Sequence, residues 1–487
     1  MMKAISLLLK AAAALLVSVP LAMGQTPGAK PSLRVLYVGI DPATATVSDM
    51  EKAFGNPART LELKQARSAD FERLLRQHFP TVKVVYGPAY KESMSADYDV
   101  TIFDTTPPRI KEAVMEKDPA TGAVTGYQPA QYLSAEFDRA AVLIAEVSPL
   151  IAEGLQYKMD WLCLCLDAHA HDMNLAHPVF NTPYKIKPTL EVRPMPENYK
   201  AYYSGRGLPD TLVMWRVQTE GYSDGKGFRA DLVSTGAGFA NAADAEVISS
   251  GVNQKERDSV ALARHGNFFH WGFSAPPAFM TEEGKLAFIN AIHYAAKFNG
   301  QHPWSRRPYR KPSRKVALDI AYMQTKNTYE DWVRMQQQSH ESRKNYLSQM
   351  QKAGVTLSEA DLKALEAPMP PVPDREQWMK REVLSRHADS TVAQLGSDVS
   401  KYLPFYEQNL EYLRPAARTY SFEVDEDVRS LAVSNREVST LDLCVAMLEG
   451  NIEADKAARI LTRYTGQNFQ TPAQWRQWLG GNRSRLY

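Results

Sequence analysis

The sequence lacks an apolar run of the length that a membrane helix needs. Residues 11–19, the apolar stretch near the N-terminus, fall well short of the roughly 20 residues that cross a bilayer. Lys3 and Lys10 precede this stretch and the small residue Gly24 follows it, which is the order found in a cleavable secretory signal. We therefore expect residues 1–24 to be a signal peptide and the mature protein to be periplasmic or secreted. An uncleaved N-terminal anchor is the alternative.

Cysteine is also scarce, with three residues in a chain of 487. That number is too small for a disulfide scaffold, so the fold must be stabilised by buried apolar side chains. Cys163 and Cys165 lie two apart in an apolar segment, where a bridge between them would strain the backbone. We expect both, and Cys444 within a helical pattern, to be buried apolar positions.

Neither sign of charge is in excess. The chain has 57 Lys and Arg residues against 55 Asp and Glu residues, and no repeat of fixed period is evident. A nucleic-acid-binding protein normally shows a basic excess or patch, so we do not expect nucleic acid to be a partner. The basic, Pro-containing segment 306–315 is interpreted as a solvated linker.

The first ordered region alternates strand and helix patterns. Continuous apolar runs that end at Gly or Asp predict buried strands, and an amphipathic pattern over residues 69–79 predicts a helix. The five strand-like runs are residues 34–39, 82–86, 98–104, 140–145 and 161–166. This alternation predicts a flavodoxin-like α/β domain over residues 31–298, with a mainly parallel sheet and helices on both faces.

The pattern of predicted secondary structure changes along the rest of the chain. Short strands are expected at residues 212–217, 259–263 and 267–273, followed by a helix over residues 282–298. A linker is expected at residues 299–315 and an all-α C-terminal region at 316–487. In that region Thr328 and Asp331 have the spacing of a capping box at the start of a long helix.

The order of elements in residues 33–298 resembles the class I glutamine amidotransferase-like fold, in its ThuA-like (trehalose-utilisation) branch. The segments that carry the resemblance are residues 34–39, 99–105, 140–148, 177–178 and 266–273. The resemblance implies a Cys nucleophile on a sharp turn after a central strand. Residues 144–149 have no Cys there, and Ser148, the one candidate substitute, precedes Pro149. We therefore expect no amidotransferase chemistry.

Acidic side chains follow four of the predicted strands. In open α/β sheets, ligands bind beyond the carboxyl ends of the strands, so these residues predict a small-molecule site at that edge. The candidate ligand-binding residues are Asp41, Asp104, Glu146 and Asp167. A small polar ligand fits this chemistry, and the aromatic-rich segment 199–222 could add stacking surfaces for a carbohydrate.

One further cluster has the residue types of a metal site. His169, His171 and Asp172 follow the predicted strand 161–166, and His177 comes shortly after. Alternate residues of an extended chain share a side, and neutral imidazole is a good zinc ligand. A bound zinc could generate a hydroxide nucleophile near neutral pH. The alternative is a polar loop without metal.

Two functions of different class therefore stay open at this point. The first is an exported, non-catalytic binding protein without a cofactor, whose helical region contacts a protein partner. The second is a metal-dependent hydrolase of a small molecule or glycan that uses the zinc cluster. Sequence does not identify the ligand.

Overall fold

The structure is a computed structural model, and it describes residues 33–117, 119, 124–157, 165–220, 244–301, 314–416 and 421–482. Several predictions fall outside these residues. They are the signal peptide, Cys163, most of the strand expected at 161–166, and most of the linker expected at 299–315. Among the described residues, no helix is both long enough and apolar enough to cross a membrane.

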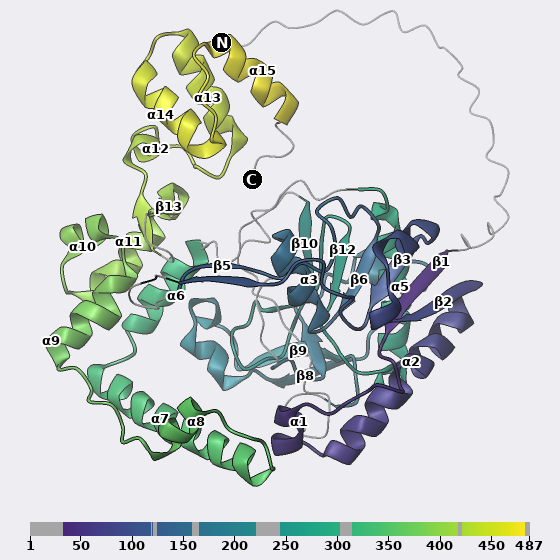
Figure 1. Cartoon of the computed structure of the whole chain (residues 1–487). Helices are drawn as coiled ribbons and strands as arrows, with labels where there is room; N and C mark the ends of the chain where they lie inside the picture. The colour runs from purple at the N-terminus through teal and green to yellow at the C-terminus, as the bar shows by residue number, and fades with distance from the viewer. Residues whose placement is uncertain are drawn as a thin grey trace, which may run out of the picture. The chain divides into compact units, whose positions relative to one another are not determined.

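A ten-stranded sheet forms the centre of the first region, in the order β2-β1-β3-β6-β12-β11-β10-β7-β9-β8 (Figure 1). Its parallel half contains β2 (Thr81–Tyr86), β1 (Arg34–Gly39), β3 (Val100–Phe103), β6 (Ala141–Ile144) and β12 (Phe268–Trp271). Its antiparallel half adds β11 (Val260–His265), β10 (Ala245–Gly251), β7 (His169–His171), β9 (Thr211–Arg216) and β8 (Leu190–Pro194).

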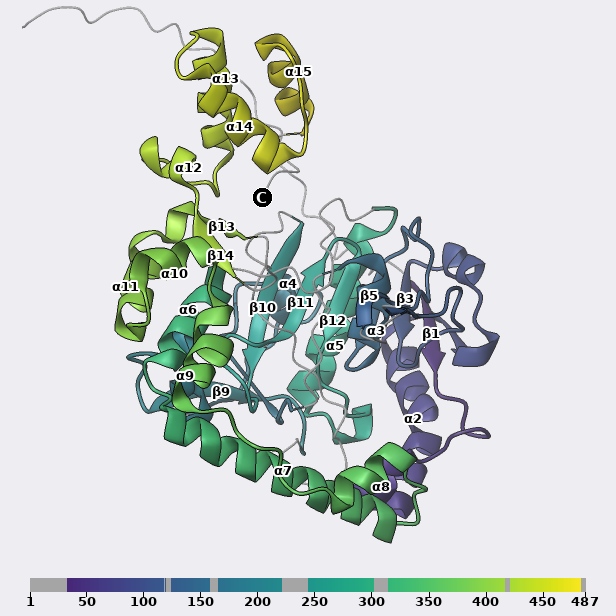
Figure 2. The ribbon, with the colours of Figure 1, turned by 60° about the vertical axis from the view of Figure 1, so that its left-hand side comes forward.

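The prediction of a mainly parallel sheet is therefore wrong, although the α/β class with a large sheet is confirmed. Four of the pairings between these strands are parallel and five are antiparallel. The strands after residue 244 are joined without crossover helices, and β10, β11 and β12 lie side by side (Figure 2). Gly266 makes the tight β11–β12 turn with φ 56°, a backbone conformation that favours glycine.

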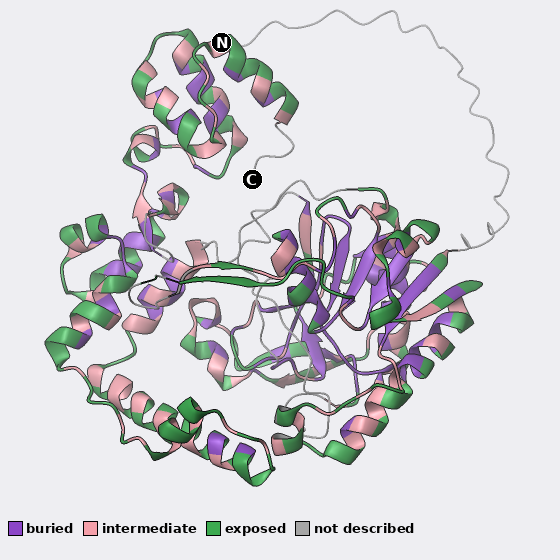
Figure 3. Ribbon diagram, viewed as in Figure 1, coloured by how far each residue is buried: buried purple, intermediate pink, exposed green. Residues whose placement is uncertain are grey.

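Helices cover both faces of the parallel half, as the alternation of side chains along β1 requires. Val35 and Tyr37 pack with the apolar faces of α2 (Pro57–His78) and α5 (Glu282–Ala295). Leu36 packs on the other side, in the same core as α3 (Val147–Leu155). The strands β1, β3, β6 and β12 are almost wholly buried (Figure 3), so successive residues serve two separate cores.

The C-terminal region is mostly helical, but the prediction of an all-α region is wrong, because β13 (Leu413–Pro415) and β14 (Phe422–Val424) form a short hairpin there. The capping box of Thr328 and Asp331 is confirmed at the start of α7. The longer helices of the C-terminal region are α6 (Arg314–Gln324), α7 (Tyr329–Lys352), α8 (Glu359–Glu366), α13 (Val438–Glu449), α14 (Ala454–Thr465) and α15 (Pro472–Asn482). The shorter helices are α9 (Arg375–Trp378), α10 (Asp389–Leu395), α11 (Tyr402–Gln408) and α12 (Glu426–Ser430).

Charged side chains join the start of α6 to the first region. Lys315 Nζ pairs with Glu256, lies 2.8 Å from Asp319 and 3.4 Å from Asp258. Asp319 also accepts a hydrogen bond from the backbone N–H of Tyr203. Arg314 and Lys315, which we expected in the linker, are the first two residues of α6.

Cysteine behaves differently from our expectation at one position. Cys165 is buried in the apolar core, as predicted, but it is also disulfide-bonded, which was not expected. Cys444 is free and buried, as predicted.

Candidate ligand-binding rim

The connection from β6 to α3 contains a strained residue. Ala145 has φ 47°, which is uncommon for a residue with a side chain. Glu146 then occupies the N-cap position of α3, without a capping hydrogen bond to its side chain. A strand, a strained residue and a helix are the parts of a nucleophile elbow. Here the strained position carries an alanine methyl group, which cannot act as a nucleophile. The elbow falls within residues 144–149, the stretch that the resemblance indicated, and Ser148 lies three residues after Ala145, inside α3.

Ser148 lies inside the protein rather than on the rim. Its hydroxyl donates to the Leu143 carbonyl oxygen at 3.2 Å, and its oxygen lies 2.7 Å from His270 Nδ1. One hydroxyl hydrogen serves one acceptor, so Nδ1 of His270 must be the protonated donor in this pair. The imidazole nitrogen next to Ser148 is therefore not available as a general base for it.

Asp104, at the end of β3, holds an arginine at the rim. Its carboxylate accepts hydrogen bonds from Nε and Nη2 of Arg67, both at 2.6 Å, and from the Tyr37 hydroxyl at 2.6 Å. Arg67 also donates to the backbone carbonyl of Ser274. Burial is the main cause that raises the pKa of Tyr37, with the nearby Asp104 charge adding to it. The bidentate pair fixes the guanidinium plane of Arg67 at this edge.

Glu146 comes shortly after β6, the strand next to β3, and its carboxyl group is the one in this area that is left available to a ligand. Within the described residues its carboxylate makes no hydrogen bond or ion pair. Although the residue is exposed, surrounding protein atoms desolvate its carboxyl group, and this burial is the largest cause that raises its pKa. The positive charges of Arg67 and Lys64 oppose that rise in pKa.

We call Glu51, Lys64, Arg67, Asp104 and Glu146 the rim cluster. Lys64 Nζ lies 2.7 Å from Glu51, whose charge, like that of Asp104, raises the pKa of Glu146. The cluster thus combines two cations with a carboxyl group whose proton affinity is raised. This combination can bind a polar molecule through charge-assisted hydrogen bonds.

The other two predicted rim residues are not part of the cluster. Asp41 accepts a hydrogen bond from the backbone N–H of Ala43 at 2.9 Å and so stabilises its own turn. Asp167 accepts one from Ala168 N–H at 2.8 Å and leads into β7, four strands along the sheet from β6. At about 4.8 Å per strand, that places Asp167 roughly 19 Å from Glu146.

The histidines predicted as zinc ligands make other contacts. Both ring nitrogens of the buried His171 are engaged, Nδ1 with Asp172 at 3.0 Å and Nε2 with the Tyr199 hydroxyl at 3.1 Å. His169 Nε2 lies 3.4 Å from a guanidinium nitrogen of Arg193. Burial is the largest cause that lowers the pKa of His169, and the Arg193 charge adds to it.

His177 is placed apart from these two residues. Its Nδ1 caps helix α4 (Pro178–Asn181), and its Nε2 lies 3.6 Å from Glu246. Across the described residues, no group of three or more His, Cys, Asp or Glu side chains is arranged to hold a metal ion. The zinc site stays a prediction that measured metal content can test.

The sequence pointed to Asp104 and Glu146 but missed Arg67 and Lys64. We expected the helix to start at residue 69, whereas α2 begins at Pro57 after the Asn56 cap. An Asn followed by Pro is a helix-start signal that would have revealed the longer helix. On that helix Arg67 lies one turn before Phe71, over whose ring its guanidinium packs at 5.2 Å.

Comparisons with known proteins add little to this geometry. No family model matches the chain, and no curated protein does. A solved structure described as a ThuA-like protein from Bacteroides uniformis ATCC 8492 matches with a TM-score of 0.25 and 10% identity. The match covers 57% of this chain and 95% of that one. At that TM-score the match carries no argument about the fold or the function of this chain.

Proposed function

We propose that this chain is an exported, amidotransferase-like protein that binds a small polar ligand at the rim cluster without covalent catalysis. The observation that carries the proposal is the carboxyl group of Glu146. Glu146 directly follows Ala145, the strained residue of the elbow, whose side chain is only a methyl group. The positive charges of Arg67 and Lys64 act on the Glu146 carboxyl group.

The chemistry of the cluster defines the ligand class. A carboxyl group with raised pKa can donate a hydrogen bond when protonated and accept one when ionised. Arg67 and Lys64 offer donors to oxygen atoms of a ligand. A compact molecule with several hydroxyl or carboxyl groups, a sugar among them, matches these groups.

The test of the proposal is a stabilisation screen on the mature chain. Monosaccharides, disaccharides, hydroxy acids and amino acids would each be added, and the melting temperature compared with and without compound. A compound that binds the folded protein and not the unfolded chain raises the melting temperature. We expect at least one compound to do so, and Glu146→Gln to abolish most of the rise.

Glu136→Gln, at an exposed position before β6, is the matched control and should keep the full rise. The proposal is wrong if no compound stabilises the protein, or if Glu146→Gln and Glu136→Gln respond to the compound equally.

Export is tested separately. N-terminal sequencing of the protein recovered from outside the cytoplasm should start near Gln25. Protein that still begins at Met1 would contradict the cleaved signal.

A further inference from the structure

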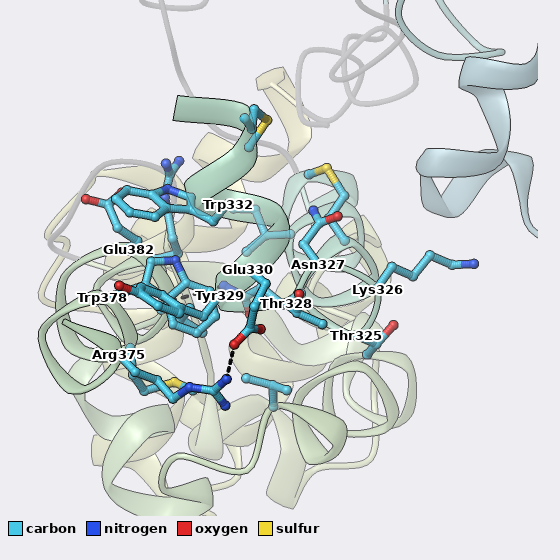
Figure 4. Close-up of a pocket in the computed structure, with 18 of the residues that line it drawn as sticks. Thr325, Lys326, Asn327, Thr328, Tyr329, Glu330, Trp332, Arg375, Trp378 and Glu382 are labelled. Atoms are coloured by element: carbon cyan, nitrogen blue, oxygen red, sulfur yellow. Dashed lines mark hydrogen bonds and ion pairs between the residues drawn. The ribbon is translucent and has the colours of Figure 1, made fainter. Parts of the chain in front are cut away.

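The helical region contains a groove that the rim proposal does not use. Its volume is about 620 Å³, and it lies between α6, α7, α9 and the turn that follows α9 (Figure 4). Small-molecule sites have volumes in the range of about 300–1,000 Å³ and combine apolar walls with a few polar groups. The groove therefore has the size of a ligand site, and its side chains show which ligand it fits.

One wall of the groove is aromatic. Tyr329 and Trp332, one turn apart on α7, have nearly parallel rings, with an interplanar angle of 19° and centroids 6.3 Å apart. Trp378 packs edge-on against Tyr329 from α9, and the Tyr329 hydroxyl donates to the Pro373 carbonyl at 2.8 Å. Trp378 is buried, whereas Tyr329 and Trp332 are half-buried and keep part of their rings accessible. The wall is a fixed platform of two aromatic faces.

Charged groups also line the groove. Glu382 and Arg386 are one turn apart, and both line the groove. Neither makes a hydrogen bond or an ion pair with any residue in the described part of the chain. A second carboxylate, Glu330, is already neutralised by Arg375, the pair marked in Figure 4. An acceptor and a donor in the lining of the groove are thus left free to bind a ligand.

The back of the groove is held rigidly. Gln324 of α6 donates through Nε2 to the Val383 carbonyl at 3.1 Å and accepts at Oε1 from His387 Nε2 at 2.7 Å. Val383 ends a π-helix over Met379–Val383, which follows α9 directly. Such π-helical turns are rare and occur frequently at functional sites. The clamp on Gln324 preorganises the groove, which lowers the cost of binding.

We propose that this groove binds a carbohydrate, with sugar rings stacked on Tyr329 and Trp332 and sugar hydroxyls bonded to Glu382 and Arg386. A pyranose has an apolar C–H face that packs on aromatic rings and a periphery of hydroxyls that both donate and accept. The groove offers the complement of each, an aromatic platform together with a free acceptor and a free donor.

Two other ligand classes fit the groove less well. A cation would compete with Arg375, whose guanidinium already lies 5.7 Å from the centre of the Tyr329 ring. Lys326, Arg375 and Arg386 also outnumber the two lining carboxylates. A purely apolar ligand would bury Glu382 and Arg386 without partners, which costs free energy.

The test uses the full mature chain on an immobilised glycan array, followed by calorimetric titration with the free form of any glycan retained. We expect retention of at least one glycan class. Trp332→Ala and Glu382→Gln should each weaken binding about tenfold or more, as loss of one good contact does.

Two variants outside the groove serve as controls and should bind as wild type does. They are Tyr346→Ala, an aromatic on the same helix α7, and Glu376→Gln, an exposed carboxylate on α9. Circular dichroism checks that Trp332→Ala is folded. Glu382→Gln removes only a charge at the surface, so it keeps the proposal testable if that first variant is unstable.

The proposal is overturned if no glycan is retained, or if the two groove variants bind as tightly as the two controls. It is also overturned if the groove takes up an apolar dye that no glycan displaces. None of these outcomes depends on Glu146, so failure here leaves the rim proposal standing.

Discussion

The hydroxyl oxygen of Ser148 lies 2.7 Å from Nδ1 of His270, and both side chains are fully buried. The geometry superficially resembles a serine–histidine pair of a hydrolase. Because the Ser148 hydroxyl already donates to the Leu143 carbonyl, the imidazole must donate to the serine, which is the reverse of activation. The pair is a structural hydrogen bond between α3 and β12.

The first prediction concerns Ser148→Ala. Wild type and variant should both fail to release ammonia from glutamine, whereas the variant should lose about 1–3 kcal/mol of unfolding free energy, since His270 loses its acceptor. Denaturant unfolding measures the loss, with the exposed Ser400→Ala as control. Ammonia release by wild type that disappears in Ser148→Ala would contradict the assignment.

The second prediction uses the raised pKa of Glu146. Because the folded state holds this proton more tightly than the unfolded state, Glu146 stabilises the protein below its ordinary pKa of 4.5. That contribution is lost as pH rises through the higher pKa of the folded state. Glu146→Gln should therefore be more stable than wild type near neutral pH, with the difference vanishing in acid.

Melting temperatures across the acid to neutral range would show this convergence of the two curves. Glu136→Gln provides the parallel control, for which we expect no such dependence. Curves for wild type and Glu146→Gln that stay parallel at every pH would show that the pKa of Glu146 is not raised.

Much of the parallel half of the sheet could be predicted from sequence. The predicted strand at residues 34–39 coincides with β1, and those at 82–86 and 140–145 overlap β2 and β6. Strands buried on both faces are continuous apolar runs, which are easy to recognise. The positions of Asp104 and Glu146 followed, because carboxyl ends of neighbouring parallel strands meet at one edge.

The antiparallel half was predicted only in part: the strands expected at residues 212–217 and 259–263 overlap β9 and β11, but β7 and the directions of the strands were not expected. β7 has only three residues, His169–His171, and its polar sequence suggested a loop with metal ligands. Its place between β10 and β9 depends on pairing partners distant in sequence, such as Ser250 and Met214 for His171. Local patterns do not carry strand direction, so the sheet was assumed to continue in parallel.

The third prediction concerns His169 and His171. Purified protein should contain well under one equivalent of zinc, because both nitrogens of His171 are already hydrogen-bonded. His171→Ala should nevertheless cost about 1–3 kcal/mol of unfolding free energy, since it removes a fully buried side chain together with its hydrogen bonds to Asp172 and Tyr199. Elemental analysis and denaturant unfolding check the two halves of the prediction.

A chelator should not change the melting temperature of wild type. One tightly held zinc per chain, absent after His169 and His171 are both replaced by Ala, would instead establish the metal site. It would also favour the hydrolase, with Asp172 and His177 as the next residues to replace.

The last prediction concerns the buried His387 behind the carbohydrate groove. Its Nδ1 lies 2.8 Å from the Tyr406 hydroxyl and its Nε2 lies 2.7 Å from Gln324, and burial lowers its pKa from 6.5 to about 4. The unfolded chain therefore binds a proton at this residue between those pH values, whereas the folded chain does not. Stability must fall as pH decreases through this window, by roughly 3 kcal/mol in total.

His387→Gln cannot take up that proton, so it should lose less stability than wild type between about pH 7 and about pH 4.5 in urea unfolding. His340→Gln, at a half-buried position on α7, should follow wild type. Direct titration of the His387 ring by NMR gives the same answer without a mutation. A ring that titrates near its ordinary pKa would show that His387 is hydrated, and that the clamp on Gln324 is not the rigid back wall that the groove needs.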